Sequence, residues 1–237
     1  MIDWHSHILP QMDDGSKSIE ESVTLLSMLS AQGADTVIAT PHFYANDESV
    51  ERFLERRVEC YDRLRSVLPD GKPEILLGAE VSYYFGISRL EELSMLCVEG
   101  TNLLLLEMPF TSWSDSVIRD IIEIATQRSV TVILAHIERY IDMQSGSTFD
   151  ELRAHGVIMQ VNASFFRRRA TRRKALRLLK KRQIALVGSD THNIKSRPPA
   201  LDEAYDIIER KFGNAFVNEI NEYGYFLLDN KYINNKI

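Results

Sequence analysis

The sequence predicts an α/β fold of the barrel type, in which helices cover a parallel sheet. Three observations support this prediction: seven apolar runs rich in β-branched residues, amphipathic segments between them, and polar side chains where the runs end. Near-continuous apolar strands that alternate with helices are typical of βα units. A chain of 237 residues with 44% hydrophobic residues suits one such unit, so we expect a single domain over residues 1–237.

The strand pattern recurs along the chain. It begins in the opening IDWHSHIL and returns in residues 36–42, 74–83, 102–110, 130–140, 157–166 and 184–193. Helical patterns occupy residues 18–33, 50–68, 115–129, 201–212 and 215–223. The first helix carries a capping box from Ser18 to Glu21 and ends at Gly33. The last two follow the seventh strand, and we expect them to close the fold.

Composition excludes several classes of protein. No apolar run approaches the roughly 20 residues that span a bilayer, and the N-terminus lacks the basic start of a signal peptide, so we expect a cytoplasmic protein without membrane insertion. Cys60 and Cys97 lack the CxxC spacing of a metal or redox motif, and two cysteines are too few for a disulfide scaffold. We interpret both as ordinary reduced thiols.

Charge is unevenly distributed. Residues 167–182, RRRATRRKALRLLKKR, hold ten basic and no acidic residues, so the remainder carries −16 when the whole chain carries −6. Blocks of this kind bind nucleic acid or anionic surfaces in some proteins. Apolar residues such as Leu178 and Leu179 give the segment a second side. A solvated amphipathic helix and a surface for an anionic partner, such as a phosphorylated protein tail, both fit this pattern.

Ionisable and polar residues mark the ends of the predicted strands. In barrel enzymes, catalytic groups gather at the C-terminal ends of several strands. Five of the six histidines occupy such positions, and His155 is the exception, which we expect at a helix end on the surface. The strand-end residues are His5, His7, His42, Glu80, Glu107, His136, Asn162, Asp190 and His192.

These side chains favour a metal site. A buried ionised carboxylate costs several kcal/mol unless it is paired or bound to metal, and too few lysines and arginines stand at these strand ends to pair the carboxylates of Asp14, Glu80, Glu107 and Asp190. The first strand offers His-x-His and the last offers Asp-x-His, in each case two side chains on one face. Closure of a barrel would make these two strands neighbours.

The same residues resemble a known family. HSH, DDG, TPHF, GAE, LLEMPF, AHIERY and GSDTHN followed by RPP resemble the motifs of the PHP (polymerase and histidinol phosphatase) metal-dependent phosphoesterases. The chain is most similar to the bacterial branch of manganese-dependent protein tyrosine phosphatases associated with capsular and exopolysaccharide synthesis. The resemblance runs from His5 to Pro199. It implies the PHP fold, a distorted seven-stranded (β/α)7 TIM-like barrel, with three divalent metal ions.

The resemblance also implies a division of the ligands. His5, His7, Glu80 and Asp190 would hold one ion, Glu80 would bridge to a second ion held by Glu107 and His136, and Asp14, His42 and His192 would hold the third. Asp13 could exchange roles with Asp14, which we favour because Gly15 follows it. Imidazole and carboxylate ligands without thiolate suit Mn²⁺, Fe²⁺ or Zn²⁺, and the branch implies Mn²⁺.

The chemistry expected of such a site needs no enzyme nucleophile. Ions roughly 3.5–4 Å apart can clamp phosphoryl oxygens and turn a water into hydroxide. Cys60 has Arg65 five residues later, as in cysteine-dependent phosphatases, but its YDRLRS context is helical. Arg139 and Arg197 match the HIER and RPP motifs and are expected to bind phosphate. The aromatic residues Tyr140, Phe43 and Tyr44 either wall the leaving group or pack at the rim.

The resemblance implies hydrolysis of phosphotyrosine on a protein, such as the tail of a bacterial tyrosine kinase that regulates capsule synthesis. Three alternatives stay open: a histidinol-phosphate phosphatase with the same metal site, an exonuclease-type module using the basic segment, and an inactive binding module. The complete ligand set argues against the last, and no polymerase domain accompanies the chain, so we expect no nucleic-acid partner. Oligomeric state is left open.

Overall fold

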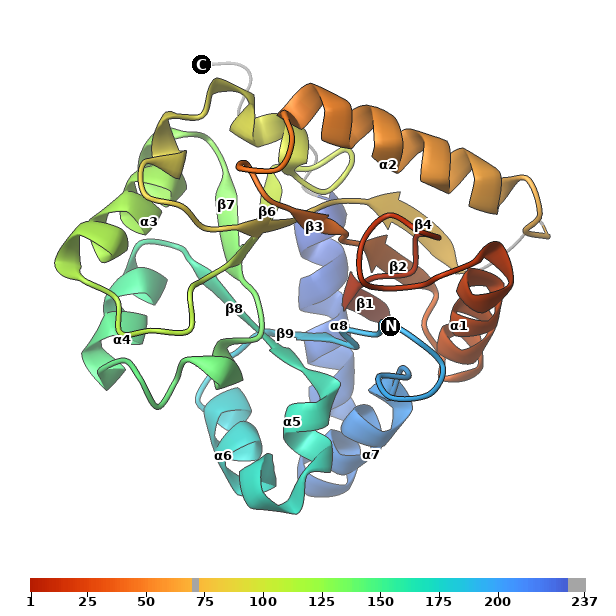
Figure 1. Cartoon of the computed structure of the whole chain (residues 1–237). Helices are drawn as coiled ribbons and strands as arrows, with labels where there is room; N and C mark the ends of the chain where they lie inside the picture. The colour runs from red at the N-terminus through yellow and green to blue at the C-terminus, as the bar shows by residue number, and fades with distance from the viewer. Residues whose placement is uncertain (70–72, 230–237) are drawn as a thin grey trace.

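A computed structural model describes residues 1–69 and 73–229, and it arranges them around a curled parallel sheet (Figure 1). The strands are β1 Ile2–Ser6, β2 Thr36–Ala39, β3 His42–Phe43, β4 Glu74–Leu77, β5 Glu80–Ser82, β6 Leu103–Glu107, β7 Thr131–Leu134, β8 Ile158–Asn162 and β9 Leu186–Gly188. The α-helices are α1 Ile19–Ala31, α2 Val50–Arg65, α3 Asp115–Gln127, α4 Gly146–Ala154, α5 Ala163–Arg167, α6 Arg169–Lys180, α7 Leu201–Phe212 and α8 Asn214–Asp229. Three short 3₁₀ helices are η1 Ile87–Arg89, η2 Glu91–Leu96 and η3 Ile137–Arg139.

The strands form two parallel sheets, ordered β1-β2-β4 and β3-β5-β6-β7-β8-β9. Two predicted strands are interrupted, one between β2 and β3 and one between β4 and β5. The first interruption contains Pro41, which has no N–H for a ladder bond. Backbone bonds still join the two interruptions, from Gly78 N to Ala39 O at 2.8 Å and from Glu80 N to Pro41 O at 3.0 Å. These two bonds continue the pairing of β2 with β4 into the pairing of β3 with β5, so the two sheets are joined there.

The first and last strands are also neighbours. Ser6 and Thr191 form an isolated parallel bridge. Asp190 N donates to His5 O at 2.7 Å, and His7 N donates to Thr191 O at 2.9 Å. The curled α/β sheet is thus present, while the closed seven-stranded barrel stays a prediction.

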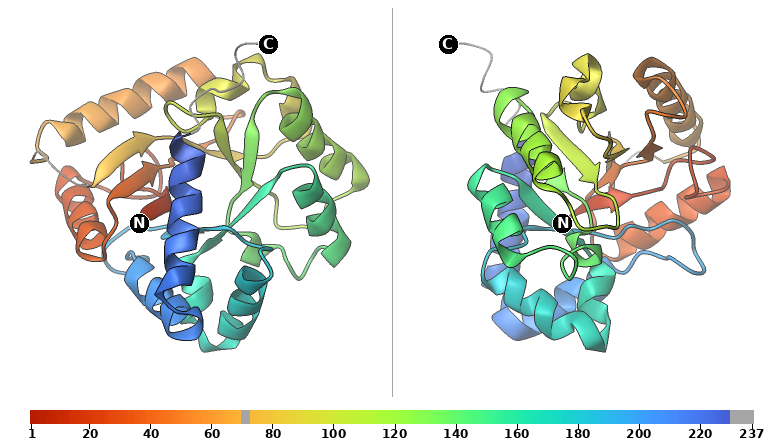
Figure 2. Two further views of the ribbon diagram at one scale, coloured as in Figure 1. Left: turned by 180° about the vertical axis from the view of Figure 1, so that it is seen from behind. Right: turned by 60° about the vertical axis from the view of Figure 1, so that its left-hand side comes forward.

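An apolar interior fills the curl, and α8 covers it. Inward-facing residues of several strands form this inner core together with Leu228 of α8. The strand residues include Ile2, Trp4, Ile38, Leu103, Leu105, Ile133, Ile158 and Leu186. The view from behind shows α8 lying across the sheet (Figure 2). Gly224 makes this contact possible, because a Cβ there would meet Ile2 at 3.2 Å and Trp4 at 3.3 Å. The opposite faces of the strands pack beneath the surrounding helices.

Helix positions follow the predictions closely. Ser18 caps α1 by accepting from Glu21 N at 3.2 Å, but the Glu21 carboxylate accepts from Lys17 N instead of completing the box. The basic segment, predicted as one helix, is divided between α5 and α6 at Arg168. Helix α4 was not predicted, and the last eight residues of the expected domain lie outside the described residues.

Several predicted strands extended too far, and two of them ran into a following helix. The strand predicted to end at residue 140 ends at Leu134, and the chain then enters η3. Residue His136 has φ of 32°, which is incompatible with a strand. The strand predicted to end at residue 166 ends at Asn162, where α5 begins. Apolar composition continued across both turns, so the hydrophobic pattern alone did not mark them.

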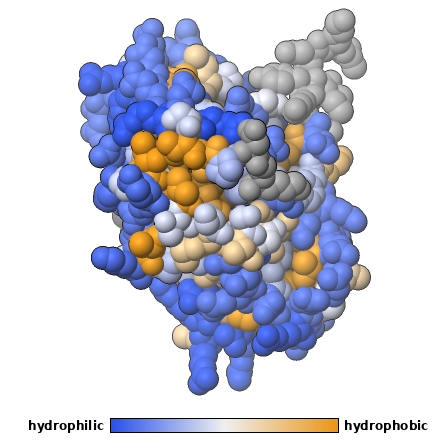
Figure 3. Space-filling model, turned by 90° about the vertical axis from the view of Figure 1, so that its right-hand side faces the viewer, coloured by the Kyte–Doolittle hydropathy of each residue, from blue (hydrophilic) through white to orange (hydrophobic). Residues whose placement is uncertain are grey.

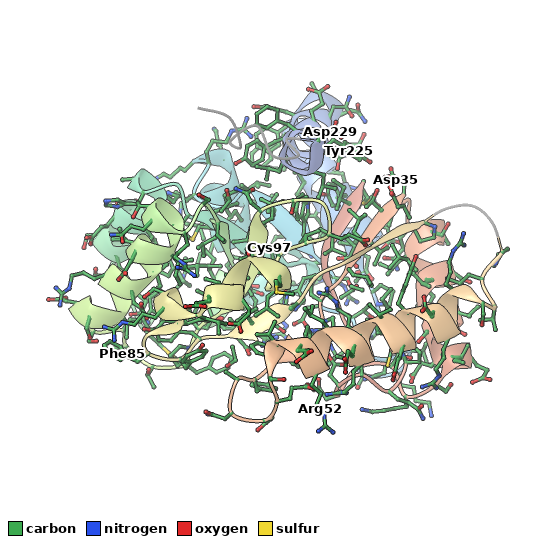
Figure 4. The ribbon with its side chains drawn as sticks, turned by 90° about the horizontal axis from the view of Figure 1, so that it is seen from above. Asp35, Arg52, Phe85, Cys97, Tyr225 and Asp229 are labelled. Carbon is green, nitrogen blue, oxygen red and sulfur yellow. The ribbon has the colours of Figure 1, made fainter. Side chains whose placement is uncertain are left out.

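A groove in the described residues lies on the side of α1, α2 and β4. It has a volume of about 1240 Å³, and apolar surface gathers on this face (Figure 3). Asp35 and Tyr225, both labelled in Figure 4, are among its lining residues, and the Tyr225 hydroxyl donates to the Asp35 carboxylate at 2.6 Å. None of the predicted metal ligands lines this groove. Within residues 1–69 and 73–229, every helix is too short or too polar to cross a membrane.

Candidate metal centre

A bulge in β1 places the two histidines of the His-x-His motif. Asp3 pairs with Val37, but Ser6 pairs with Ala39, so β1 has one extra residue between these two pairs. Such a bulge changes the alternation of side chains along a strand. Trp4 can therefore point into the inner core while His5, the next residue, also points inward.

Glu80 lies at the middle of the cluster. Its Oε2 atom lies 3.1 Å from His5 Nε2, 3.3 Å from His7 Nε2 and 3.1 Å from His42 Nδ1. Its Oε1 atom lies 2.8 Å from His136 Nε2. These five residues come from β1, the segment after it, β3, β5 and the end of β7. The parallel arrangement therefore brings strand ends from both sheets to one point.

Three further carboxylates surround this centre. Asp14 Oδ1 lies 3.3 Å from His192 Nε2 and 3.4 Å from His42 Nε2. Glu107 Oε1 lies 3.3 Å from His136 Nε2. Asp190 Oδ1 lies 3.7 Å from both His5 Nε2 and His7 Nε2. Asp14 is the exposed member, with 63% of its side chain accessible, and it marks the open side of the cluster.

The structure brings together all nine residues that the sequence suggested as ligands. They form four overlapping groups whose potential ligand atoms lie within 4.8 Å of one another. The groups are His7, Asp14, His42 and His192; His5, His7 and Asp190; His5, Glu80 and His136; and His42, Glu80 and Glu107. His155, the one histidine excluded from the site, is exposed at the C-terminal end of α4.

Unpaired nitrogens indicate what the cluster can bind. His42 Nδ1 and His192 Nε2 are buried and have no hydrogen-bond partner among the described residues. A buried polar atom without a partner costs free energy, and a neutral imidazole nitrogen is a metal ligand. Each unpaired nitrogen lies within 3.5 Å of a carboxylate oxygen, of Glu80 or Asp14. This donor set fits divalent cations.

The inner histidines are strongly affected by the carboxylates. Burial alone lowers the pKa of His7, but hydrogen bonds and charges from Asp13 and Glu80 outweigh burial and raise the pKa to about 10. Burial also lowers the pKa of His136, but hydrogen bonds to Glu107 and Glu80 outweigh burial and raise the pKa to about 9. Without a bound cation, protons therefore neutralise the inner cluster.

The outer histidines behave differently. Burial lowers the pKa of His42, and burial together with the charge of His7 lowers the pKa of His192 to about 4. Their rings are neutral near pH 7, and their lone pairs are available. The cluster thus contains protonated and neutral imidazoles side by side.

Asp13 positions His7 rather than facing the cluster. Its Oδ2 atom accepts from His7 Nδ1 at 2.7 Å and from His42 N at 3.0 Å, and Oδ1 accepts from Gly15 N at 2.8 Å. A side chain at Gly15 would lie 2.4 Å from His7 Cβ, so this turn needs glycine. Asp14 is left to face His42 and His192, as the preference for Asp14 over Asp13 required. The DDG motif indicated that an aspartate here belongs to the site, but it did not show that Asp13 and Asp14 have different roles.

Of the three aromatic residues for which the sequence left two roles open, Tyr140 and Phe43 pack inside the protein and do not wall the leaving group. Tyr140 and Phe43 are 0% and 1% exposed, so neither can contact a substrate. The Tyr140 hydroxyl instead hydrogen-bonds His136 Nδ1 at 2.8 Å and accepts from Met108 N. Tyr44 does lie at the rim, 40% exposed, with its ring 5.3 Å from that of His42.

Two residues at the site were not predicted. Phe110 is 51% exposed, and its ring lies parallel to that of His136 at 6.4 Å. Its signal was its position three residues after Glu107. Gln160 accepts from His136 N at 2.6 Å through Oε1, and its signal was a polar residue inside an apolar strand.

The two predicted phosphate-binding arginines converge on one carboxylate. Arg139 Nη2 and Arg197 Nη2 lie 2.5 Å and 2.6 Å from Asp190 Oδ2, which also accepts from Asn162 Nδ2 at 2.6 Å. Both arginines are partly exposed, at 32% and 39% of their side chains. Arg139 Nη1 also lies 3.8 Å from Glu107 Oε1, and each guanidinium group has further N–H donors.

Backbone strain coincides with two of the candidate ligands. His136 has φ of 32° and Asp190 has φ of 52°, a region that residues other than glycine rarely adopt. Each follows directly on a strand, β7 or β9, and turns the chain across the open end of the sheet. Strain of this kind concentrates at functional sites.

Comparisons with known proteins agree with this geometry. Tyrosine-protein phosphatase CpsB of Streptococcus agalactiae serotype III is 30% identical over 98% of this chain and 100% of its own length. Tyrosine-protein phosphatase YwqE of Bacillus subtilis is 29% identical over 98% of this chain and 93% of its own. A solved structure from work on YwqE and CpsB of Streptococcus pneumoniae, described as metal-dependent tyrosine phosphatases, superimposes with a TM-score of 0.83 at 26% identity. It covers 98% of this chain and 95% of that one.

The family comparison gives the same result. The family model for capsular polysaccharide synthesis, CpsB/CapC, matches residues 1–223 of the 237. The match includes all nine clustered residues and both arginines, and it confirms the resemblance that the motifs indicated. This chain belongs to the CpsB/CapC family of capsular polysaccharide synthesis.

Proposed function

We propose that this chain is a metal-dependent protein tyrosine phosphatase that hydrolyses phosphotyrosine. The observation that carries the proposal is the convergence of five imidazoles and four carboxylates at the open end of the sheet, with unpaired nitrogens among them. Its relatives CpsB and YwqE are named tyrosine-protein phosphatases, and both cover nearly its whole length. The proposal includes one PHP domain over residues 1–237 and closure of the sheet into a seven-stranded barrel.

Three divalent ions, Mn²⁺ above all, complete the proposed site, and Fe²⁺ or Zn²⁺ also suit its ligands. His5, His7, Glu80 and Asp190 would hold the first; Glu80, Glu107 and His136 the second; Asp14, His42 and His192 the third. When bound, such ions neutralise phosphoryl oxygens and lower the pKa of water toward neutrality. No cysteine is needed, and both Cys60 and Cys97 are buried away from solvent.

Other residues hold this arrangement in place. Asp13 fixes the ring of His7 through Nδ1, which directs Nε2 toward Glu80. The Tyr140 hydroxyl does the same for His136. Partners of this kind fix the tautomer and ring orientation of ligating histidines. We therefore assign Asp13 and Tyr140 positioning roles.

Arg139 and Arg197 would bind the phosphate and stabilise its charge. Each guanidinium group uses one nitrogen on Asp190 and has further donors in the same plane. Because the two arginines flank one carboxylate, they lie together on the same side of the cluster. A phosphate bound there would be held from that side by fork-shaped donors.

Aromatic rings at the rim favour a phenyl ester over an alkyl ester. Tyr44 lies beside His42 and Phe110 lies beside His136. Both histidines contact Glu80, so the two rings stand on different sides of the same carboxylate. A tyrosine side chain in the site can pack against these exposed faces.

The proposed natural substrate is a bacterial tyrosine kinase that regulates capsule or exopolysaccharide synthesis. The family description supplies the context of capsular polysaccharide synthesis. Intracellular ATP-dependent kinases place the encounter in the cytoplasm, and this location is part of the proposal.

A direct comparison of substrates tests the function. Manganese-loaded protein is given a phosphotyrosine peptide and histidinol phosphate, and kcat/KM is measured for each. We expect the peptide to be hydrolysed with a kcat/KM at least about ten-fold higher, since aromatic packing is worth on the order of 1 kcal/mol or more. Preference for histidinol phosphate would overturn the tyrosine phosphatase assignment. The protein would then be a PHP phosphoesterase with a small-molecule substrate.

A further inference from the structure

The basic segment of residues 167–182 forms a surface that the metal centre does not explain. Within it, Arg167, Lys174 and Arg182 form ion pairs with Glu203, Asp142 and Glu219. Along α6, five exposed cations have no acidic partner among the described residues. We call these five the α6 stripe: Arg169, Arg173, Arg177, Lys180 and Lys181.

The stripe follows one face of the helix. Arg169, Arg173 and Arg177 are spaced by four residues, which places them about 5–6 Å apart at Cβ on one side of a helix. Ala175, Leu178 and Leu179 are buried on the other side. The amphipathic helix expected from the sequence is therefore present. An amphipathic helix explains why one side of α6 is apolar. It does not explain why the solvated side carries a row of cations without any acidic residue.

Helix α6 also breaks ordinary electrostatic rules. Like charges four residues apart destabilise a helix. Arginine stands at Arg168, the N-cap, and at Arg169, the first helical residue, and the first turn holds no acidic residue. Cations at this end oppose the helix dipole. The five cations of the α6 stripe have no acidic partner among the described residues, and such a local conflict points to a partner that supplies negative charge.

Two ion pairs connect the basic segment with the metal centre, and they are made by neighbours of the stripe and not by its members. Lys174 pairs with Asp142, three residues beyond the phosphate-binding candidate Arg139. Arg167 pairs with Glu203 on α7, which follows the loop of Arg197. Helices α5 and α6 accordingly lie between α4 and α7 (Figure 1). In addition, α5 begins directly after Asn162, which donates to Asp190.

We propose that the α6 stripe binds an acidic segment of the phosphotyrosine substrate, next to the residue that is hydrolysed. This inference rests on the proposed function and specifies the class of substrate. The stripe spans about 18 Å, since α6 rises about 1.5 Å per residue over twelve residues. An extended peptide of about five or six residues covers that length.

Charge balance favours a short peptide over an extended anionic surface. The chain outside residues 167–182 carries −16. A membrane or a nucleic acid would have to approach this acidic remainder, and repulsion would oppose its binding. An acidic peptide can contact the stripe alone and leave the remainder exposed to solvent.

Matched charge variants test the proposal. Arg169→Gln/Arg173→Gln/Arg177→Gln removes three charges from the stripe while keeping good helix formers. Arg52→Gln/Arg119→Gln/Lys211→Gln removes the same charge from exposed positions on α2, α3 and α7. Three substrates are compared: a phosphotyrosine peptide flanked by glutamates, the same peptide flanked by glutamines, and para-nitrophenyl phosphate.

At low salt, the wild type should hydrolyse the glutamate peptide with a kcat/KM about ten-fold higher than the glutamine peptide. The difference should arise from a lower KM, because three partly screened charge pairs contribute about this much to binding. The stripe variant should lose this preference, the control variant should keep it, and all three proteins should hydrolyse para-nitrophenyl phosphate equally. An unchanged preference in the stripe variant would overturn the proposal. So would binding to phosphatidylglycerol vesicles that depends on the stripe without any peptide preference.

Binding separates this inference from the proposed function. Fluorescence anisotropy measures the affinity of the two peptides without turnover. Tighter binding of the glutamate peptide by wild type and control, but not by the stripe variant, supports the stripe even where no substrate is hydrolysed. Absence of all hydrolysis would overturn the phosphatase assignment alone, and equal affinities would overturn the stripe alone.

Discussion

The same strands have two very different ends. Their beginnings supply the apolar interior that α8 covers, with Ile2, Ile38, Leu103, Ile133 and Leu186 as examples. Their C-terminal ends supply the imidazoles and carboxylates of the metal centre, with His5, His42, Glu107, His136 and Asp190 in the corresponding positions. Only a few residues along each strand separate the two environments.

The two ends also differ in how complete their interactions are. Packing at the covered end is close, since a Cβ at position 224 would lie 3.2 Å from Ile2 and 3.3 Å from Trp4 and its neighbours would have to shift. The open end keeps buried nitrogens without partners and two residues at positive φ. We infer that the covered end stabilises the fold, and that the open end sacrifices some of that stability to hold ligands in place.

Removing the central carboxylate should have the largest effect on the open end. Glu80→Gln leaves His5, His7, His42 and His136 without their shared oxygen charge. We expect phosphotyrosine hydrolysis to fall on the order of a thousand-fold, because ion binding and charge neutralisation are lost together. Elemental analysis should show fewer ions per chain. Glu92→Gln, at an exposed position, is the control, and full activity in Glu80→Gln would refute the role of Glu80.

The covered end should give the opposite result. Trp4→Ala removes a buried ring that packs on Gly224 and should lower the free energy of unfolding by about 3–5 kcal/mol, as measured by urea denaturation. The metal content of the protein that remains folded should equal that of the wild type. Loss of metal from folded Trp4→Ala protein would show that the two ends are not independent.

Asp13 should have an intermediate effect. Asp13→Asn keeps the size of the side chain and can still accept from Gly15 N, but it loses the charge that orients His7. Metal affinity should fall by about 10–100-fold, the usual effect of removing such a partner. Titration with Mn²⁺ measures this directly. An affinity equal to that of the wild type would assign Asp13 to the loop alone.

Acid should weaken metal binding at the open end. In metal-free protein the carboxylates raise the pKa of His7 to about 10 and of His136 to about 9, so both rings carry protons at pH 7 that an ion must displace. Metal affinity should fall as pH falls, and binding should release protons. Protonation itself stabilises the metal-free protein below pH 6.5, and this contribution is lost as pH rises toward 9–10. Calorimetry in two buffers of different ionisation enthalpy counts the protons, and a count of zero would contradict these charge states.

The smallest expected effect concerns the rim. Phe110→Ala should raise KM for a phosphotyrosine peptide by about two- to ten-fold, because aromatic contacts contribute roughly 0.5–1.5 kcal/mol. Metal content should not change. An equal effect on an alkyl phosphoester would exclude a contact with the phenyl ring.

Sequence reasoning predicted the site residues near the ends of the strands better than the bounds of the strands. An ionisable residue at the end of an apolar run is a local signal, and eight such residues lie together in the structure with Asp14, which comes from a loop. The bulge at Trp4 and His5 has no such signal, because it depends on how β1 pairs with β2. The break between β2 and β3 has a signal in Pro41, whereas the break between β4 and β5 depends on pairing.

Roles within the site were harder to predict than membership of it. The sequence left open whether Tyr140 walls the leaving group or packs at the rim, and in the structure its hydroxyl is buried on His136. Asp13 and Asp14 are adjacent and chemically identical, and only the turn at Gly15 separates their directions. The contact of both arginines with Asp190 depends on two loops far apart in the sequence.

Reconstitution with metal tests the central claim most directly. Protein stripped of metal by a chelator is titrated with Mn²⁺ while hydrolysis of a phosphotyrosine peptide and bound ions per chain are measured together. We predict no hydrolysis at the start, and activity that rises to its maximum as three ions bind. Undiminished hydrolysis by the stripped protein would contradict the account.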